Sequence, residues 1–305
     1  MSQTSDRVDL ERSKDVLKAK LLGLMPHSGE YPAEFNGFTL FRRDDSDITH
    51  QPMVYEPVFI IIAQGIKNVR IGLDEMAYGG NSYFVSGIDI PTSCAIKGIS
   101  PDYPFLSLML KLDKVLLSQM AGEVPPQDNG APYTQGAMIA DLDAGFIDTV
   151  IRLVELMERP GQAGILAPMV IREIHYRLLI GPFGNQLRAI TSFGTPANHV
   201  AKAILWLKEN YAEPLKVDEL AAKTNMGTST FHKYFKMLTA MSPLQYQKRL
   251  RLEHAQKLML AHGHDATTAG LAVGYESQQQ FGREYKRLFG QPPRRDVSIR
   301  REKIA

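Results

Sequence analysis

The chain has 305 residues, of which 44% are apolar and 22% charged, so it has the composition of a globular protein long enough for two domains. Its formal net charge of +2 argues by itself against a strongly basic nucleic-acid binder. A single cysteine, Cys94, excludes an intrachain disulfide framework and a thiolate metal cluster. No apolar run approaches the roughly 20 residues that span a bilayer, and the N-terminus is charged where a signal peptide would be apolar. We therefore expect a cytoplasmic protein with no membrane partner.

The charge is divided unevenly along the chain. Residues 197–305 carry 18 Lys and Arg against 10 Asp and Glu, a net charge of +8, whereas residues 1–196 carry 17 against 23, a net charge of −6. The division falls at the turn-forming sequence Gly194, Thr195, Pro196. We therefore predict one domain over residues 1–195 and a second, basic domain over residues 196–305.

The first domain begins with short runs of β-forming residues. The runs are separated by turn signals such as Gln64-Gly65 and Gly79-Gly80-Asn81, and such spacing predicts a small β-barrel or sandwich. The predicted strands cover residues 35–41, 54–64, 68–71, 82–85 and 105–112.

Helical sequence follows a stretch rich in Pro, Gly and Asn at residues 124–136. Two helices are predicted at 146–158 and 166–180, each ended by a Pro-Gly or Gly-Pro pair. The first carries an apolar stripe, which we expect to pack within its own domain rather than to form a dimer seam. That stripe consists of Ile147, Val150, Ile151, Val154 and Met157.

The basic domain is helical throughout and contains an internal repeat. Sliding residues 217–243 onto 267–293, an offset of 50, superposes similar residues, and each copy has the form of a helix-turn-helix module. The first copy has helices at 217–224 and 228–239. The second has a helix at 266–273 and another that follows Ser277, where Gln280 would complete a capping box. The superposed pairs are Phe231 and Phe281, Lys233 and Arg283, Phe235 and Tyr285, Lys236 and Lys286, Leu238 and Leu288, and Pro243 and Pro293.

The second helix of each copy has a buried stripe and a polar face. Gln and Arg on such a face can bond adenine and guanine edges, and flanking Lys and Arg can neutralise phosphates. Any surface helix also shows polar residues opposite its apolar stripe, but the repetition favours double-stranded DNA as the partner. The predicted DNA contacts are Ser229, His232, Lys233 and Lys236 in the first copy and Gln278, Gln279, Gln280, Arg283, Lys286 and Arg287 in the second.

A helix joins the two copies, beginning at Ser242-Pro243 and running to about residue 260. Its length of roughly 27 Å approaches the roughly 34 Å between successive major-groove faces on one side of DNA, so the two modules fit adjacent grooves. Its basic residues are compatible with phosphate contacts or with a solvated face. These residues are Lys248, Arg249, Arg251 and Lys257.

The C-terminal hundred residues resemble the AraC/XylS family of bacterial transcription regulators. The resemblance rests on fixed-spacing elements in both modules and in the helix between them. It implies that Ser229, His232, Lys233, Gln278, Gln279, Gln280 and Arg283 face bases. The elements are Asp218-Glu219-Leu220-Ala221, Phe235-Lys236, Ser242-Pro243-Leu244-Gln245-Tyr246, Val273-Gly274-Tyr275-Glu276-Ser277, Gln280-Phe281, 283–290 and Pro292-Pro293.

A second resemblance, to the N-terminal regulatory domain of one branch of that family, covers the front of the chain. It implies a cupin-like β-barrel followed by helices, which together bind a small-molecule effector and form a homodimer. If the protein is an activator, RNA polymerase is a further partner. The matching elements include Tyr55-Glu56-Pro57, Gln64-Gly65, Tyr83, Pro91, Pro104-Phe105-Leu106, Leu112-Asp113, Leu166-Ala167-Pro168, Arg172-Glu173 and 178–182.

The effector site is predicted from the strands alone. Alternation along two strands offers Phe59, Ile61, Tyr83 and Val85 as residues that line the barrel, although alternation does not say which face is inner.

Two positions depart from the usual family pattern. Gly227 stands where a Ser usually caps the first recognition helix, and Gly270 lies inside a helix, where glycine costs about 1 kcal/mol against Ala. The second module is therefore expected to be the less stable one.

An enzymatic alternative requires a metal or catalytic site. Between residues 30 and 115 the only histidine is His50, so we expect no metal, no cofactor and no catalytic residues in the barrel. His262 and His264 are interpreted as a solvated loop, Cys94 as a packed residue and His175 as structural. We predict a sequence-specific DNA-binding transcription regulator. The alternatives are a cupin-type enzyme with a helical appendage and an effector-independent architectural DNA-binding protein.

Overall fold

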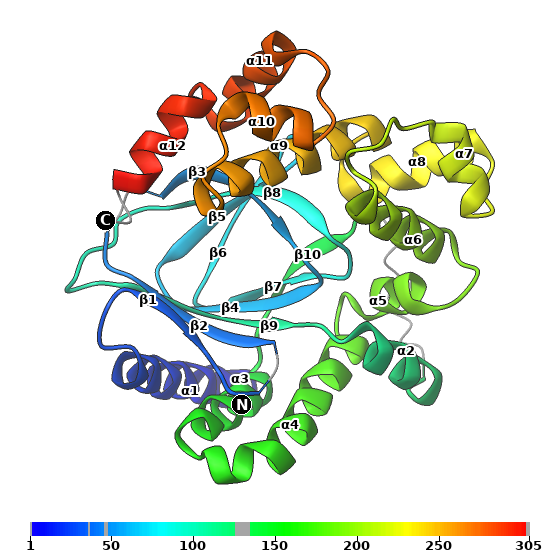
Figure 1. The fold of residues 1–305 in the computed structure, drawn as a ribbon. Coiled ribbons are helices and arrows are strands. Elements are labelled where there is room, and N and C mark those ends of the chain that lie inside the picture. Colours follow the sequence, from blue (N-terminus) through cyan, green and yellow to red (C-terminus); the bar gives the residue numbers. More distant parts are fainter. Residues whose placement is uncertain (1, 36, 46–47, 126–134, 303–305) are drawn as a thin grey trace.

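The computed structural model describes residues 2–35, 37–45, 48–125 and 135–302, and the side chains of residues 8–35, 37–45, 52–125 and 135–302. Most of the stretch 124–136 lies outside these residues, as do residue 36 of the predicted strand 35–41 and the side chain of His50. Figure 1 shows a β-sandwich at the centre, helices below it and the C-terminal helices above it and to the right.

In the described part of the chain, ten antiparallel strands form two facing sheets. The sheets share no hydrogen-bonded strand pair among the described residues, so the predicted cupin-like fold is confirmed as an open sandwich rather than a closed barrel. The six-stranded sheet has the order β1 (Gly29–Pro32), β2 (Phe38–Arg43), β9 (Phe105–Lys111), β4 (Val58–Gln64), β7 (Ser82–Ser86), β10 (Ala137–Asp141). The four-stranded sheet has the order β3 (Ile48–Tyr55), β8 (Ile90–Ile96), β5 (Ile66–Ile71), β6 (Asp74–Gly79).

Strand β4 is buried on both faces, which is why its sequence is a continuous apolar run rather than an alternating one. Ile60 and Ile62 point into the core between the sheets, and Phe59 and Ile61 point into a second core on the helical side. The predicted strand 54–64 is two strands, because the chain turns at Glu56-Pro57 between β3 and β4.

Helices cover the outer face of the six-stranded sheet, at the bottom of Figure 1. The ring of Phe146 stacks on Phe59 at 5.0 Å between centroids, and Ile147, Val150 and Val154 are fully buried. The predicted packing of this stripe within its own domain is therefore confirmed. The helices are α1 (Ser2–Leu24), α2 (Lys114–Glu123), α3 (Ala144–Glu155) with a 3-10 turn at Leu156–Glu158, α4 (Pro160–Ile180) and α5 (Gly184–Thr191).

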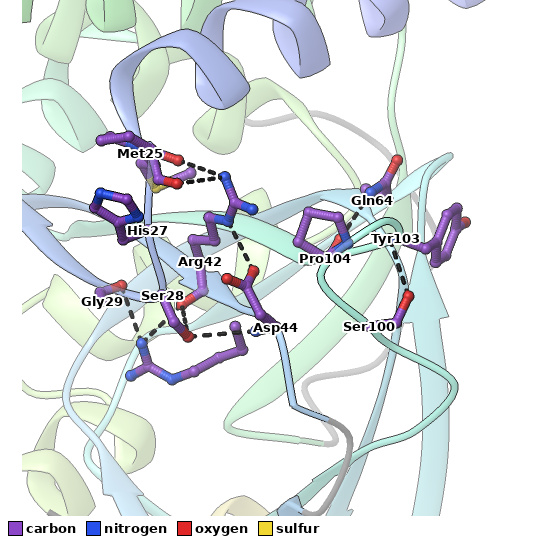
Figure 2. A network of polar contacts seen from close by, with 12 residues as sticks. Met25, His27, Ser28, Gly29, Arg42, Asp44, Gln64, Ser100, Tyr103 and Pro104 are labelled. Atoms are coloured by element: carbon purple, nitrogen blue, oxygen red, sulfur yellow. Dashed lines mark hydrogen bonds and ion pairs between the residues drawn. The ribbon is translucent and has the colours of Figure 1, made fainter.

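Helix α1 was not predicted, because its sequence is rich in charged residues and, among its described side chains, only Leu17 and Leu21 are fully buried. Figure 2 shows how the chain after this helix is tied to the sheet. Arg42 on β2 donates hydrogen bonds to the carbonyl oxygens of Met25 at 2.8 Å and Pro26 at 3.1 Å, and pairs with Asp44 at 2.7 Å. These bonds hold the end of α1 beside the sandwich.

The C-terminal part is helical, as predicted. No helix in the described part of the chain is both long enough and apolar enough to cross a bilayer. The helices are α6 (Pro196–Glu209), α7 (Val217–Lys223), α8 (Thr228–Thr239), α9 (Pro243–Ala261), α10 (Ala266–Ala272), α11 (Gln278–Phe289) and α12 (Pro293–Glu302).

Candidate nucleic-acid interface and ligand cavity

The first helix-turn-helix module consists of α7, a turn and α8, with the predicted bounds reproduced for α8. Gly227 is the N-cap of α8 in extended conformation and supplies no side-chain hydrogen bond. Phe231, Phe235 and Leu238 are fully buried at i, i+4 and i+7, which leaves the opposite face to solvent. The exposed side chains include all four predicted contacts of this module: Ser229, His232, Lys233 and Lys236.

The second module consists of α10, a turn and α11. The Ser277 hydroxyl accepts a hydrogen bond from the Gln280 backbone N–H at 3.3 Å, and Phe281 and Tyr285 are buried. All six predicted contacts are exposed, although the Gln278 side chain donates to the Thr267 hydroxyl at 2.6 Å. The six are Gln278, Gln279, Gln280, Arg283, Lys286 and Arg287.

Gln280 departs from its predicted capping role. Its side-chain amide donates to Glu284 at 3.2 Å, and Glu284 in turn pairs with Lys248 of α9 at 2.7 Å. The capping box predicted at this helix is therefore wrong. A carboxylate four residues along the same helix offers an acceptor for the amide, so the side chain does not turn back to the N-cap.

The two modules superpose with two different offsets. The N-caps of the scaffold helices, Lys216 and Asp265, are 49 residues apart, whereas the N-caps of the recognition helices, Gly227 and Ser277, are 50 apart. The second turn is thus one residue longer, and Gly270 corresponds to Ala221 rather than to Leu220. A single offset read from the recognition helices could not detect this insertion.

Glycines in the second module permit close packing. A Cβ on Gly270 would lie 3.2 Å from the ring of Phe281, so a small residue lets α10 approach α11. Gly274 has φ of +85°, and a Cβ there would lie 2.2 Å from the carbonyl oxygen of Ala212. The low helix propensity of Gly270 destabilises α10, but the absence of a side chain makes room for the buried ring of Phe281. The packing of this ring offsets part of the cost.

The basic residues of α9 form protein contacts. Arg251 donates to the carbonyl oxygens of Tyr211, Ala212, Glu213 and Gly274 at 2.7 to 3.0 Å. It thereby joins the turn of the second module to the end of α6.

Arg249 pairs with Glu253 at 2.6 Å and donates to the Thr92 carbonyl oxygen of β8 at 2.6 Å. Phosphate contacts and a solvated face are therefore both wrong for Arg249 and Arg251, whose guanidinium groups hold the fold together. Their roles depend on tertiary partners that periodicity along one helix does not show.

A cavity of about 730 Å³ lies between the two sheets and α9. Its size suits a small organic ligand. Strands supply most of the wall, whereas α9 closes one side with Leu250, Glu253, His254 and Lys257. The remaining lining residues are Glu30, Phe41, Arg43, Met53, Val54, Tyr55, Glu56, Val58, Ile60, Lys67, Cys94, Ile96, Phe105, Ser107, Met109, Lys111 and Lys208.

The four residues that alternation offered for an effector do not line this cavity. Phe59, Ile61, Tyr83 and Val85 lie in the core between the six-stranded sheet and the helices. Because both faces of β4 and β7 are apolar and buried, the sequence could not tell the cavity side from the helix side. The cavity-facing residues on β4 are Val58 and Ile60 instead.

Polar groups gather at one end of the cavity. The Lys67 ammonium bonds the Tyr55 hydroxyl, which lies 3.3 Å from the Cys94 thiol. Burial lowers the pKa of Lys67 and raises that of Tyr55, so the tyrosine hydroxyl stays protonated. Lys67 was not predicted as a site residue. The one feature of the sequence that could have indicated it is the position of this lysine two residues after the Gln64-Gly65 turn.

The cavity adjoins a polar contact between the sandwich and the first module. Lys208 of α6 forms ion pairs with Asp89 and with Glu56, the latter at 3.3 Å. The Tyr246 hydroxyl donates to the Asp89 carbonyl oxygen at 2.9 Å. Because α6 and α9 both pack against α8, these contacts connect the sandwich with the first module.

His175 and Cys94 are buried, as the sequence predicted, whereas in the predicted solvated loop His262 is exposed and His264 is half-buried. His175 is fully buried, and its Nε2 accepts from the Asp113 N–H at 3.0 Å while Nδ1 lies 2.7 Å from the Ile171 carbonyl oxygen. Cys94 is buried and free. In the described residues no group of three or more His, Cys, Asp or Glu is arranged to hold a metal ion.

The comparisons with known proteins agree with this architecture. A family model described as "AraC-type transcriptional regulator N-terminus" matches residues 34–186, and a helix-turn-helix model matches residues 220–297. The chain belongs to the AraC/XylS family of transcription regulators.

Two curated relatives carry related sequences. The transcriptional activator RhaS of Salmonella agona (strain SL483) is 30% identical over 167 residues, which are 53% of this chain and 58% of that protein. The thermoregulatory protein LcrF of Yersinia pestis is 26% identical over 205 residues, 66% of this chain and 71% of that protein. This chain thus spans little more than half the length of RhaS.

Solved structures of Vibrio cholerae ToxT share the fold at low sequence identity. The wild-type protein of strain SCE256 with an unsaturated fatty acid bound has a TM-score of 0.53 at 10% identity, over 86% of this chain and 95% of that chain. ToxT of strain O395 bound to (E)-4-(8-methylnaphthalen-1-yl)but-3-enoic acid has a TM-score of 0.57 at 10% identity, over 87% and 99%.

Proposed function

We propose that this protein is a sequence-specific DNA-binding transcription regulator whose two helix-turn-helix modules read adjacent major-groove faces. The observation that carries the proposal is the repeated module with ten exposed polar and basic residues on its two recognition helices. The 19 residues of α9 span about 28 Å, which suits modules one helical turn of DNA apart.

A small-molecule effector controls these modules through the cavity. Helix α9 both closes the cavity with Leu250 and His254 and carries the modules at its two ends. A ligand that favours one position of α9 therefore changes how the modules are presented to DNA. ToxT, which shares this fold, was solved with an unsaturated fatty acid bound, and this supports a ligand site in this chain. In this scheme the effector domain covers residues 1–195 and the DNA-binding domain covers residues 196–305.

A second copy of this chain is the proposed partner in solution. Helix α4 exposes Ile165, Met169 and Tyr176 with Arg172 between them, at the i, i+4, i+7 and i+11 spacing of a helix–helix seam. A two-fold dimer would place four modules on a symmetric operator. Met169→Glu should shift the protein to monomer in sedimentation equilibrium, with Val115→Glu on α2 as the control.

The regulator acts in the cytoplasm as a DNA-binding protein rather than an enzyme, and if it activates transcription it contacts RNA polymerase. RhaS, an activator, supports this assignment. The alternative of an effector-independent architectural protein predicts equal affinity for all DNA.

The test is selection of bound genomic fragments by the full chain, followed by footprinting of the best fragment. We expect protection of about two major-groove faces per protomer and at least about 1,000-fold preference over bulk DNA. Equal binding to bulk DNA, or protection of a single groove, would contradict the proposal.

A further inference from the structure

The charged groups that line the cavity are unequally paired. Its three carboxylates each have a cation partner: Glu30 with Arg43 at 3.1 Å, Glu56 with Lys111 at 2.8 Å, and Glu253 with Arg249 at 2.6 Å. Lys208, on the same wall, pairs with Glu56 and Asp89. The charge of each of these groups is therefore already compensated by its partner, and no ligand is needed for that.

Of the other cations that line the cavity, Arg43, Lys111 and Lys208 pair with carboxylates and Lys257 is exposed to solvent, whereas Lys67 is half-buried. Among the described residues it pairs with no carboxylate, and its polar contact is the neutral Tyr55 hydroxyl. Its ammonium also lies 5.1 Å from the centroid of the Tyr55 ring. Enclosure of an ammonium without an anion is unfavourable, and here it is reflected in the lowered pKa of Lys67. An anion entering the cavity would relieve this cost.

The neighbouring walls are apolar. Met53, Ile96, Phe105, Met109 and Leu250 line the same cavity. A doubly charged or sugar-like ligand would leave polar groups against these side chains without hydrogen-bond partners. The ligand that fits both features has one anionic group and an apolar body.

We propose that the cavity binds a monocarboxylic acid with an apolar body, and that the Lys67 ammonium and the Tyr55 hydroxyl hold its carboxylate. This inference rests on the proposed function, since it names the chemical class of the effector. The ammonium forms a charge-assisted hydrogen bond, and the protonated hydroxyl donates a second one. The apolar body extends toward Leu250, so the acid contacts the helix that carries both modules.

The experiment titrates the full chain by calorimetry with straight-chain acids from butanoic to octanoic, and with the primary amide of each acid. We expect affinity to rise with chain length and each amide to bind at least about 10-fold more weakly than its acid. Lys67→Met should weaken acid binding about 10- to 100-fold without weakening the amide, and Tyr55→Phe should have a smaller effect.

Arg70→Met is the matched control, because it removes a cation from the exposed side of the same strand β5 and should leave affinity unchanged. Lys67→Arg keeps the charge and should retain part of the affinity. Thermal unfolding of each variant establishes that it folds. Equal binding of acids and amides, unchanged binding by Lys67→Met, or no binding by any acid would overturn the inference.

The two proposals fail separately. A chain that selects operator DNA while binding no acid retains the proposed function and loses this inference. A chain that binds acids through Lys67 but selects no DNA fragment retains the cavity assignment and loses the proposed function.

Discussion

The two helix-turn-helix modules are similar in sequence but are packed against different parts of the molecule. The core of the first module includes Ile88 and Ile190 from the N-terminal half, and the Gly136 N–H donates to the Leu238 carbonyl oxygen at 3.0 Å. Among the residues whose side chains are described, the core of the second module contains only those from Tyr211 onward. The sandwich therefore contacts the first module through its core, whereas the second module is attached mainly through α9.

The largest difference between the modules is expected at the turn that follows each scaffold helix. Gly274→Ala forces a side chain into the left-handed region and into the Ala212 carbonyl, and should destabilise the second module by about 2–4 kcal/mol. The equivalent Asn225 already has φ of +56°, so Asn225→Ala should cost about 1 kcal/mol. Chemical denaturation of each variant measures the loss in free energy of unfolding. DNA footprinting then shows which module has lost its contact with the operator. Equal losses in the two variants would show that the turns are equivalent.

The next effect concerns DNA reading by the second module. Arg283→Ala should lose about 1–3 kcal/mol of specific binding and relax preference at one base position. Competition binding with single-base operator variants provides the measurement. Arg12→Ala, which removes the same charge from an exposed position on α1, is the control. An equal loss on scrambled DNA would mean that Arg283 contacts only phosphate.

A smaller effect should appear where the sandwich meets the first module. Asp89→Asn weakens the ion pairs with Lys208 and Lys114, and should cost about 1–2 kcal/mol because both lysines are partly exposed. Hydrogen exchange should accelerate in α8 and stay unchanged in α11. Matching acceleration in both helices would contradict the difference in attachment described above.

The smallest effect is a pH dependence at α9, which lies between the modules. Burial raises the pKa of Glu253 above its ordinary value of 4.5, although Arg249 partly opposes the shift. The folded protein then holds this proton more tightly than the unfolded chain, so stability increases as pH falls toward the raised pKa and decreases as pH rises through it. Relative to Glu253→Gln, the parent should gain stability between pH ~7 and pH ~5 in urea unfolding. The opposite slope would mean that the ion pair with Arg249 outweighs the effect of burial on the pKa of Glu253.

Local patterns predicted the recognition helices well. The spacing of Phe231, Phe235 and Leu238, and of Phe281 and Tyr285, gave the correct buried face, because a helix of period 3.6 fixes its exposed face from its own sequence. The same reasoning failed for Arg249 and Arg251. Their partners, Thr92 and the carbonyls near Tyr211, come from elements far away in the chain.

The effector residues show a different limit. Phe59 and Ile60 are adjacent on one strand and equally apolar, yet Ile60 faces the cavity and Phe59 faces α3. Which residues face the cavity and which face the helices is decided by the helices that cover one face of the sheet. Helix α1 was not predicted for a related reason. The buried face of this helix is narrow, and its burial depends on packing against the sheet.

The sequence by itself determined the basic C-terminal part, its repeated module and the exposed face of each recognition helix, since these follow from composition and from periodicity within single helices. The tertiary structure decided which strand face forms the cavity, that Lys67 lies in it without a carboxylate partner, and that the sandwich joins the core of the first module alone. These features depend on contacts between elements that are far apart in the chain. The free energy of such contacts cannot be deduced from the sequence of any one element.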